Sequence, residues 1–429
     1  MESTVPHPAW ARESVIYELN TRQFTPEGTF RAVVPRLDEL QQLGVGIVWF
    51  MPIHPIGNAN RKGPLGSPYA AFDYYAVNPE FGTVDDFKQL VRGIHDRGMR
   101  VVIDLVANHT AWDSVLSREH PEWFYHDGKG RFVPPVASWS DVIRLDYRHA
   151  GLRRYMLDMM EYWVRDVGID GFRCDVAQLV PTDFWDEARR RLDRIKPVYL
   201  LAEAESPALV QDAFDCDYAT ELFHAFIRIA RGKAGARALD ALVKDDARRY
   251  PWGSWRMLFI TNHDQNTWLE SDVRLYGLEA SKALATLTFT MPGQPLIYNG
   301  QETGNPRKLA FFARDPITWT DPHGLRAFYQ RLSGIRRNWP ALVAGRMNRV
   351  CTGRHRHVYA FTRTTEGSAP VLVVANLSPR PATCVVRVPR DIGKVTDALS
   401  GATLLAQHGR LQLALDGWGV RVIPCQASS

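Results

Sequence analysis

The feature that most constrains the fold is the alternation of short apolar runs with segments of helical period over the first three quarters of the chain. Residues 46–51 and 100–106 are mostly apolar runs of strand length, as expected of strands buried on both faces. Between them, Thr83 followed closely by acidic residues is typical of a helix N-terminus. Repeated strand-then-helix units with apolar strands predict a parallel sheet, and about eight such units predict a closed barrel.

The pattern places most elements of this barrel along the chain. Strands are expected at 15–19, 46–51, 100–106, 171–176, 198–202, 257–261 and 295–298, and helices at 30–43, 83–98, 152–167, 182–194 and 279–290. The sixth strand is expected within 206–250, where no run of strand length stands out. Residues 110–148 lack clear periodicity and are too long for an ordinary loop, so they predict a small excursion on the catalytic side.

The pattern of expected elements changes after Gly345. Short β-rich runs at 357–364, 370–376, 383–388 and 420–424 are separated by Gly, Pro and Asp, which predicts a small antiparallel domain. The expected fold class is therefore α/β: a (β/α)8 TIM barrel with a small excursion after strand three and a C-terminal antiparallel β domain. The expected domains are residues 1–345 for the barrel, including the excursion at 110–148, and residues 346–429 for the β-rich domain.

Composition and charge narrow the possible partners. The 52 Lys plus Arg exceed the 47 Asp plus Glu by only five, and no long basic run concentrates this charge, so no nucleic-acid partner is expected. No stretch approaches the roughly 18 apolar residues of a membrane span, so no membrane partner is expected. Five widely spaced cysteines without a CxxC pair argue against a disulfide framework and a zinc site. The first residues show no signal peptide, which predicts a cytoplasmic location.

Charged and polar residues gather where the expected strands end. Strand three ends in Asp104, Asn108 and His109, strand four in Arg173, Cys174 and Asp175, strand five in Glu203, and strand seven in Asn262, His263 and Asp264. In a closed barrel the C-terminal strand ends meet at one mouth, where active-site groups lie. Carboxylates, histidines and an arginine converging on one mouth are costly to bury unless they serve a function.

Four of these segments, in this order, resemble the signature regions of the α-amylase family of retaining glycoside hydrolases, glycoside hydrolase family thirteen. They are Asp104 to His109, Gly171 to Asp175, Ala202-Glu203, and Asn262 to Asp264. Supporting segments at 46–55, 67–75, 81–83 and 293–302 agree with the family pattern. The resemblance covers about residues 10–345, and the β-rich tail matches the family's usual C-terminal domain.

The resemblance implies how the carboxyl groups divide the chemistry. Cleavage through an oxocarbenium-like transition state needs two carboxyl groups, one ionised and one protonated at the same pH. By resemblance, Asp175 is the nucleophile and Glu203 the general acid/base, with a pKa raised by a desolvated site. Arg173, on the same strand face as Asp175, is expected to hold it ionised. Because the family retains the anomeric configuration, the two carboxyl groups are expected about 5–5.5 Å apart.

The same resemblance implies the groups that bind the sugar. Asp264 matches the family's third carboxylate, which grips sugar hydroxyls and favours a distorted ring. His109 and His263 match the pair that hydrogen-bonds the sugar on the donor side of the cleaved bond, and Tyr69 matches the aromatic platform beneath that sugar. The implied substrate is an α-1,4-linked glucose oligomer or polymer, and no cofactor is implied.

Two segments depart from the family pattern. Many members carry a Lys-His pair after the nucleophile strand where this chain has Gln178 and Leu179, so the acceptor side is altered. The family's structural calcium is typically held by the Asn of the third-strand motif and by an Asp at the position where Arg144 stands. Since a guanidinium cannot ligate a cation, we expect no metal there. A salt bridge from Arg144 to a carboxylate, or a hydrogen bond to Asn108, is expected to replace the ion.

Other interpretations use the same residues. The covalent intermediate also serves an α-glucosyltransferase, a transglycosylase or an α-glucosidase, in which a sugar can replace water as the acceptor. A non-catalytic sugar-binding protein is a further alternative, against which the presence of all three carboxylates argues. Asp104 and Asn108 are weighed equally between chemistry and support of the strand end. Packing is the favoured role of Cys174, Asp73, Trp112, Trp139 and Trp319.

Overall fold

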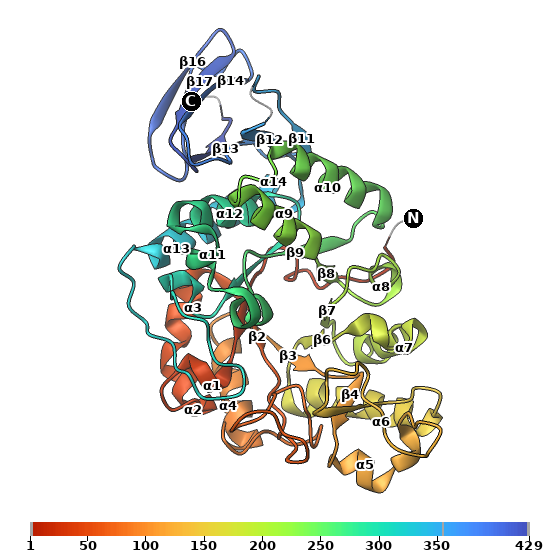
Figure 1. Ribbon diagram of the computed structural model, residues 1–429. Helices are drawn as coiled ribbons and strands as arrows, with labels where there is room; N and C mark the ends of the chain where they lie inside the picture. Colours follow the sequence, from red (N-terminus) through yellow and green to blue (C-terminus); the bar gives the residue numbers. More distant parts are fainter. Residues whose placement is uncertain (1–2, 354–355, 427–429) are drawn as a thin grey trace.

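Parallel strands close into a barrel at the centre of the molecule (Figure 1). The computed structural model describes residues 3–353 and 356–426. Within this part of the chain, the eight barrel strands follow one another around the ring as β1 (Val15–Leu19), β10 (Gln294–Tyr298), β9 (Trp255–Leu258), β8 (Cys216–Tyr218), β7 (Tyr199–Ala202), β6 (Gly171–Cys174), β3 (Arg100–Leu105) and β2 (Val45–Phe50). The last strand pairs again with β1, and all neighbours are parallel. The predicted (β/α)8 barrel is confirmed.

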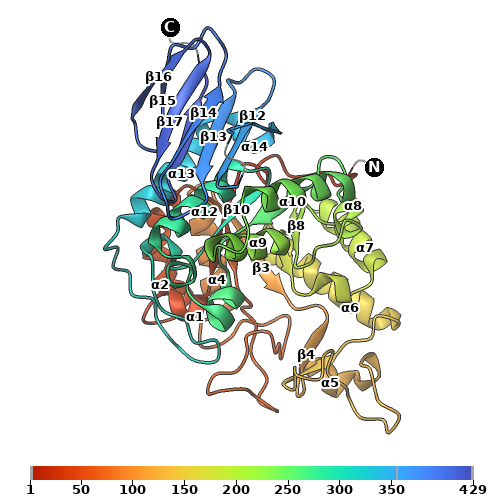
Figure 2. The same cartoon turned by 45° about the horizontal axis from the view of Figure 1, so that its top comes forward.

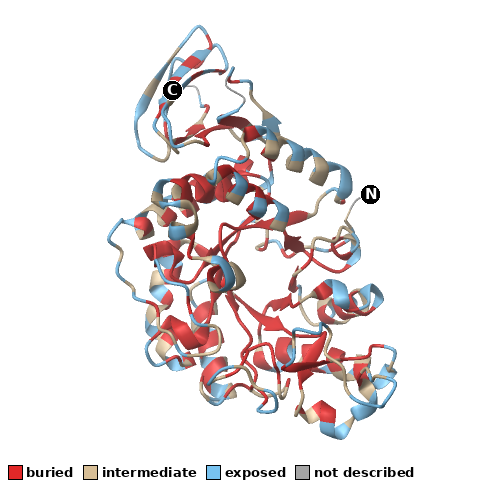
Figure 3. Cartoon of the chain, viewed as in Figure 1, coloured by how far each residue is buried: buried red, intermediate tan, exposed pale blue. Residues whose placement is uncertain are grey.

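Most of the helices cover the outside of the barrel, while α5 belongs to the excursion after β3. In chain order they are α1 (Thr21–Phe24), α2 (Phe30–Val33), α3 (Leu37–Leu43), α4 (Val84–His95), α5 (Val115–Glu119), α6 (Ala150–Tyr162), α7 (Thr182–Asp193), α8 (Leu209–Asp212), α9 (Thr220–Ala230), α10 (Ala236–Arg249), α11 (Asp272–Tyr276), α12 (Leu278–Thr290), α13 (Leu325–Asn338) and α14 (Pro340–Ala344). Figure 3 shows buried strands inside and helices whose outer faces are exposed. This layering matches strands that are apolar on both faces.

The helix after β2 shows how the sequence builds these layers. The Thr83 hydroxyl accepts a hydrogen bond from the Asp86 N–H at 3.1 Å, and the Asp86 carboxylate accepts one from the Thr83 N–H at 3.0 Å. This reciprocal capping satisfies two N–H groups that a helix start leaves without partners. Phe87, Leu90 and Ile94 then follow at helical spacing and are buried in the main core.

Some elements differ from the sequence-based expectations. The helix expected at 30–43 is split into α2, a short 3₁₀ segment that contains Pro35, and α3, because proline lacks the N–H and clashes with the preceding turn. The unplaced sixth strand is β8, only three residues long. Its central residue, Asp217, interrupts the apolar run by which a buried strand is recognised.

The excursion after β3 carries a small sheet of its own. Strands β4 (His109–Ala111) and β5 (Val142–Arg144) pair antiparallel, and the Leu145 N–H donates to the Asn108 carbonyl at 3.1 Å. In both ribbon views the excursion extends from one edge of the barrel, away from the C-terminal sheets (Figure 2). Since β4 begins at His109, the excursion is anchored to the predicted site.

Two antiparallel sheets form the C-terminal part of the described chain. One orders β11 (Arg346–Arg349), β12 (Val358–Thr364), β13 (Val371–Asn376) and β18 (Val420–Pro424), and the other orders β14 (Ala382–Arg387), β17 (Arg410–Leu415), β16 (Thr403–Gln407) and β15 (Lys394–Thr396). Their facing side chains, such as Val374 and Leu413, share one buried cluster. The predicted antiparallel character is confirmed, although β11, β15, β16 and β17 were not among the expected strands. Among the described residues, no helix is long and apolar enough to cross a membrane.

Candidate active site

A cavity of about 320 Å³ lies at the C-terminal mouth of the barrel. Its lining includes six of the seven predicted site residues, namely Tyr69, His109, Asp175, Glu203, His263 and Asp264. The seventh, Arg173, is fully buried and holds the carboxylates of the cavity from behind. The structure therefore brings together all the residues that the strand ends predicted.

One guanidinium faces three carboxyl groups. The Arg173 Nη1 donates to both oxygens of Asp104, at 2.9 and 3.1 Å, and to Asp175 Oδ1 at 3.0 Å. Its Nη2 forms an ion pair with Glu203 Oε1 at 2.9 Å. The barrel register explains the arrangement, because Asp104 on β3 lies directly beside Arg173 on β6. Asp175 follows two residues later, and Glu203 ends the neighbouring strand β7.

Three carboxyl groups around one guanidinium favour retention of a proton. Burial raises the pKa of Asp175 well above its ordinary value, the charge of Glu203 raises it further, and Arg173 lowers it by less. Burial likewise raises the pKa of Asp104 to about 6 against the opposing effect of Arg173. Arg173 therefore does not outweigh burial and the neighbouring carboxyls in setting the pKa of Asp175.

The backbone after the nucleophile candidate is strained. Val176 has φ 37° and ψ 47°, a left-handed conformation that costs a β-branched residue about 1–3 kcal/mol. In this conformation the Val176 N–H donates to Glu203 Oε2 at 2.7 Å. The strained peptide and Arg173 thus hold the two oxygens of Glu203 between them, which fixes this carboxyl beside Asp175.

His263 is the centre of a second buried network. Its Nδ1 lies 2.5 Å from Glu18 Oε1, and its Nε2 lies 2.9 Å from the Tyr69 hydroxyl. The Tyr69 hydroxyl in turn donates to Asp104 Oδ2 at 3.0 Å. Burial by itself lowers the pKa of His263, but the Asp264 and Glu18 carboxylates outweigh it and raise the pKa to about 9. His263 is therefore a cation at neutral pH, with a donor on each ring nitrogen. The Nε2 donor faces both the Tyr69 hydroxyl and, at 3.4 Å, Asp264 Oδ2, so a bound sugar hydroxyl would share it with these groups.

Glu18 is a site residue that the strand-end pattern did not predict. It is fully buried in β1, within the otherwise uncharged run Val15 to Leu19. No other charged residue stands beside it in the sequence to mark the site, in contrast to Arg173 and Asp175. A lone carboxylate in a buried barrel strand needs a buried partner, and this local anomaly could have identified it.

His109 differs from His263 in charge. It lies with its Nε2 3.9 Å from Asp175 Oδ2, and burial lowers its pKa to about 4. His109 is therefore neutral at pH 7, and offers a hydrogen bond without adding charge next to the nucleophile candidate. The two histidines that resemblance paired thus flank the cavity with different protonation.

Aromatic rings line the rest of the cavity. The Tyr69 ring lies parallel to Phe311, with 6.0 Å between centroids and 4° between planes. Trp268 is 56% exposed at the rim, and Trp139 lines the cavity with its ring 5.5 Å from His109. Packing is therefore not the only role of Trp139, because this side chain also lines the cavity. Flat rings of this kind suit the apolar faces of sugars.

Arg144, the residue expected to disfavour calcium, does not make the contact that was expected of it. The Arg144 guanidinium lies over the Tyr125 ring, 4.2 Å from its centroid. No hydrogen bond or ion pair found in the described residues joins its side chain to Asn108 or to a carboxylate, so the predicted replacement contact is wrong. Asp146, the nearby acidic residue, is paired with Arg148, with the shortest contact at 2.5 Å. Among the described residues no group of three or more His, Cys, Asp or Glu side chains is placed to hold a metal ion, and the absence of calcium stays a prediction.

Chelation gives a direct test of the metal prediction. A metal bound at about one hundred times its dissociation constant stabilises a fold by about 2.7 kcal/mol, or several degrees. EDTA is therefore expected to leave both the melting temperature and the activity unchanged, and Arg144→Asp is expected to improve neither without added calcium. A fall in melting temperature with EDTA that calcium reverses would contradict the prediction.

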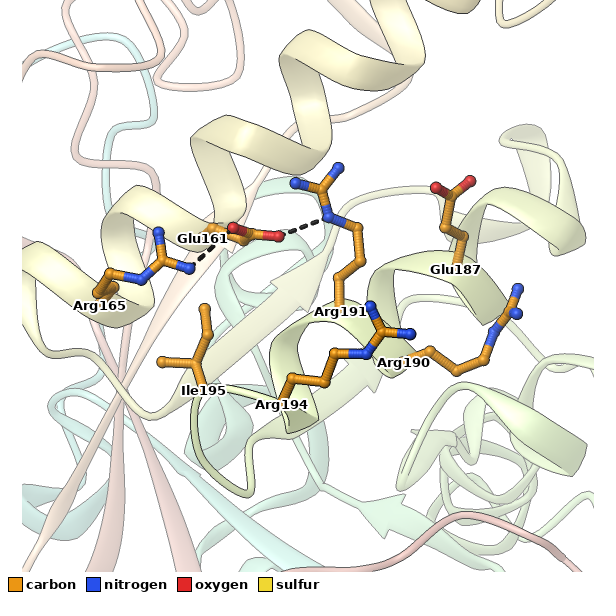
Figure 4. A pocket seen from close by; sticks show the side chains of 7 residues that line it. All are labelled: Glu161, Arg165, Glu187, Arg190, Arg191, Arg194 and Ile195. Carbon is orange, nitrogen blue, oxygen red and sulfur yellow. Dashed lines mark hydrogen bonds and ion pairs between the residues drawn. The ribbon is translucent and has the colours of Figure 1, made fainter.

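A groove larger than the cavity at the barrel mouth lies elsewhere, and different kinds of side chain line it. The groove of about 520 Å³ between α6 and α7 is lined by four arginines, two glutamates and Ile195 (Figure 4). Its Glu161 is already paired with Arg165 and Arg191, at 2.9 and 2.5 Å. The groove lies on the outer helical layer, away from the strand ends, and it holds no pair of adjacent carboxyls. We therefore place the active site at the barrel mouth.

Comparison with known proteins identifies the family of this chain. The family model "Alpha amylase, catalytic domain" matches residues 13–128 and 114–336. A crystal structure of a noncanonic maltogenic alpha-amylase from Thermotoga neapolitana superposes with a TM-score of 0.89 and 30% identity, over 97% of this chain and 100% of that one. An alpha-amylase from Lactobacillus plantarum gives a TM-score of 0.86 and 35% identity, over 97% and 99%.

Curated relatives are longer than this chain. Alpha-amylase MalA of Haloarcula japonica is 31% identical over 92% of this chain, which spans only 59% of that relative's length. Neopullulanase 2 of Thermoactinomyces vulgaris is 28% identical. The match covers 95% of this chain and 77% of the length of that relative. With its barrel, its site and these matches together, the chain belongs to the α-amylase family of glycoside hydrolases, family thirteen.

Proposed function

We propose that the protein hydrolyses α-1,4-linked glucose oligomers or polymers with retention of the anomeric configuration. The observation that carries the proposal is the pair of carboxyl groups, Asp175 and Glu203, held by the single guanidinium of Arg173 at one end of the cavity. The names of the relatives, alpha-amylase and neopullulanase, supply the substrate class. The cytoplasmic location and the lack of a nucleic-acid partner remain predictions from the sequence.

In the first step, an Asp175 oxygen attacks the anomeric carbon while Glu203 gives its proton to the leaving glycosidic oxygen. The bond to that oxygen breaks, and a glycosyl ester of Asp175 forms. In the second step, Glu203 takes a proton from water, which attacks the same carbon and restores both groups. The separation of about 5–5.5 Å expected for a retaining pair stays a prediction.

The remaining cavity groups position the sugar in this proposal. The His263 cation and the Asp264 carboxylate, 3.4 Å apart, present a donor and an acceptor to neighbouring hydroxyls. Neutral His109 binds a hydroxyl on the other side, and Tyr69 lies beneath the ring. Because Glu18 fixes the His263 ring through Nδ1, the donor at Nε2 keeps one direction, which reduces the ordering cost on binding.

Transfer to a sugar acceptor is the second candidate. Leu179 is 40% exposed and, together with Gln178, lines a groove of about 700 Å³ beside the nucleophile strand. An apolar residue exposed where many relatives have a Lys-His pair offers a surface for an acceptor sugar. If maltose in excess diverted the products to longer oligosaccharides, transfer would be the better description.

The proposal is tested by product analysis on soluble starch, maltotriose, trehalose, sucrose and cyclodextrin. We expect turnover of the α-1,4-linked linear substrates, with the α-anomer of the product appearing first in a proton NMR time course. Initial release of the β-anomer would contradict retention. Tight maltooligosaccharide binding without turnover would instead identify a sugar-binding protein.

A further inference from the structure

The loop after β2 crosses one side of the cavity. We call residues 57–66 the rim loop. At one end, Lys62 Nζ pairs with Asp141 Oδ1 at 2.8 Å and donates to the Ser138 carbonyl at 3.2 Å, both on the excursion. At the other end, the Leu65 N–H donates to the Phe312 carbonyl at 2.9 Å, on the loop after β10. The rim loop therefore joins the excursion to the loop after β10.

The rim loop is fixed along its length. The Asn58 N–H donates to the Asp113 carboxylate at 3.0 Å, and Arg61 Nε donates to the Gly57 carbonyl at 2.9 Å. From below, the buried Arg22 guanidinium donates to the Gly66 carbonyl at 3.3 Å. At Gly63 an added Cβ would lie 2.5 Å from the Phe312 Cβ, so loop and neighbour are in close contact. The rim loop is thus held at several points, and it contributes Lys62 to the lining of the cavity.

The order of the strands tells which end of the substrate this wall faces. In the ring, β7, which carries Glu203, lies four strands from β1 in either direction. The loops after β2 and β10, which meet at Phe312, flank β1 and so stand opposite Glu203. Because Glu203 protonates the leaving oxygen, the leaving part of the glucan extends on the Glu203 side. The rim loop faces the other part, which becomes bonded to the nucleophile.

We propose that the rim loop closes this donor end, so that the protein accepts a glucan by its non-reducing end and releases short products from that end. This inference rests on the proposed function. A cavity of about 320 Å³ is at the small end of ligand pockets, which span about 300–1,000 Å³. The Lys62 ammonium and the buried Asp141 carboxylate line it and supply a donor and an acceptor for the terminal hydroxyls. Lys62 and Phe312 are thereby specificity-determining residues.

A blocked substrate tests the inference in the wild-type protein. p-Nitrophenyl maltoheptaoside, free or carrying a 4,6-ethylidene group on its non-reducing end, is digested, and the first products are identified by mass spectrometry. We expect kcat/KM on the blocked compound to be lower by about 100-fold or more, because a closed end rejects the larger group. Rates within about threefold of each other would overturn the inference. Failure to cleave either compound would instead count against the proposed function.

Variants assign the effect to the rim loop. Lys62→Ala combined with Phe312→Ala is expected to raise the blocked-to-free ratio about tenfold, and Lys62→Ala alone is expected to raise it less. The control Lys62→Arg keeps a cation opposite Asp141 and is expected to keep the wild-type ratio. An unchanged ratio in both alanine variants, at a wild-type melting temperature, would overturn the assignment to these residues.

Discussion

Asp175→Asn is expected to lower kcat/KM on maltooligosaccharides by at least about 10³-fold. The amide cannot form the glycosyl ester, and the variant also removes the negative charge that faces the developing oxocarbenium ion. Because Asn keeps the shape of Asp and can still accept from Arg173 Nη1, which lies 3.0 Å from Asp175 Oδ1, folding is expected to persist. Initial rates and the melting temperature, measured together, check both expectations.

Asp104→Asn provides the matched control for the nucleophile. Asp104 faces the same guanidinium, at 2.9 Å, but it does not line the cavity, so its replacement makes the same change from carboxyl to amide without removing a reacting atom. We expect a loss at least about tenfold smaller than that of Asp175→Asn. If Asp175→Asn kept more than about a tenth of the wild-type activity, the covalent role would be wrong.

Most of the residues that sequence could predict lie in an apolar strand or within a few residues after one. Asp175 and Glu203 directly follow β6 and β7, and parallel strands in a barrel must bring their ends to one mouth. Their convergence therefore follows from topology once the strands are recognised. Family resemblance then supplied roles that the residue types by themselves leave open, since a strand-end aspartate also serves as a cap or an ion-pair partner.

The residues that sequence did not predict depend on long-range contacts. Glu18 acquires its role from His263, which is 245 positions away in the chain. Lys62 meets Asp141 only because a loop and an excursion, both without periodicity, fold toward each other. The register and spacing of strands contain no information on such loop contacts, which is why the closed side of the cavity appears only in three dimensions.

The direction of the pKa shift of Asp175 also could not be predicted from the sequence. Arg173 two residues before Asp175 suggested a simple ion pair, but burial and two further carboxyls reverse the sign of the pKa shift of Asp175. A desolvated carboxyl next to a second one holds its proton more strongly. In the proposed reaction Asp175 must be ionised when it attacks. Because its pKa is raised, the acid limb of the pH–rate profile is expected at a higher pH than an ordinary aspartate would give.

Glu203→Gln is expected to have the second-largest effect, and one that depends on the leaving group. On natural glucans, whose leaving oxygen needs a proton, we expect kcat to fall about 10²–10⁴-fold. On an activated aryl α-glucoside, which leaves with little protonation, the fall is expected to stay within about tenfold. The wild-type decline of activity at high pH reports loss of the acid's proton, so this basic limb is expected to disappear in the variant.

The contacts of Glu203 determine how this variant must be controlled. Both carboxyl oxygens face donors, Arg173 Nη2 at 2.9 Å and the Val176 N–H at 2.7 Å. A glutamine must turn its NH₂ group toward one of them, which leaves a donor without an acceptor and destabilises the fold by about 1–3 kcal/mol. Glu203→Ala leaves both donors without an acceptor and also removes the proton donor, so the melting temperatures of both variants must be measured beside their rates. Equal losses on natural and activated substrates in both variants, with melting temperatures near wild type, would show that Glu203 supports the site's structure and transfers no proton.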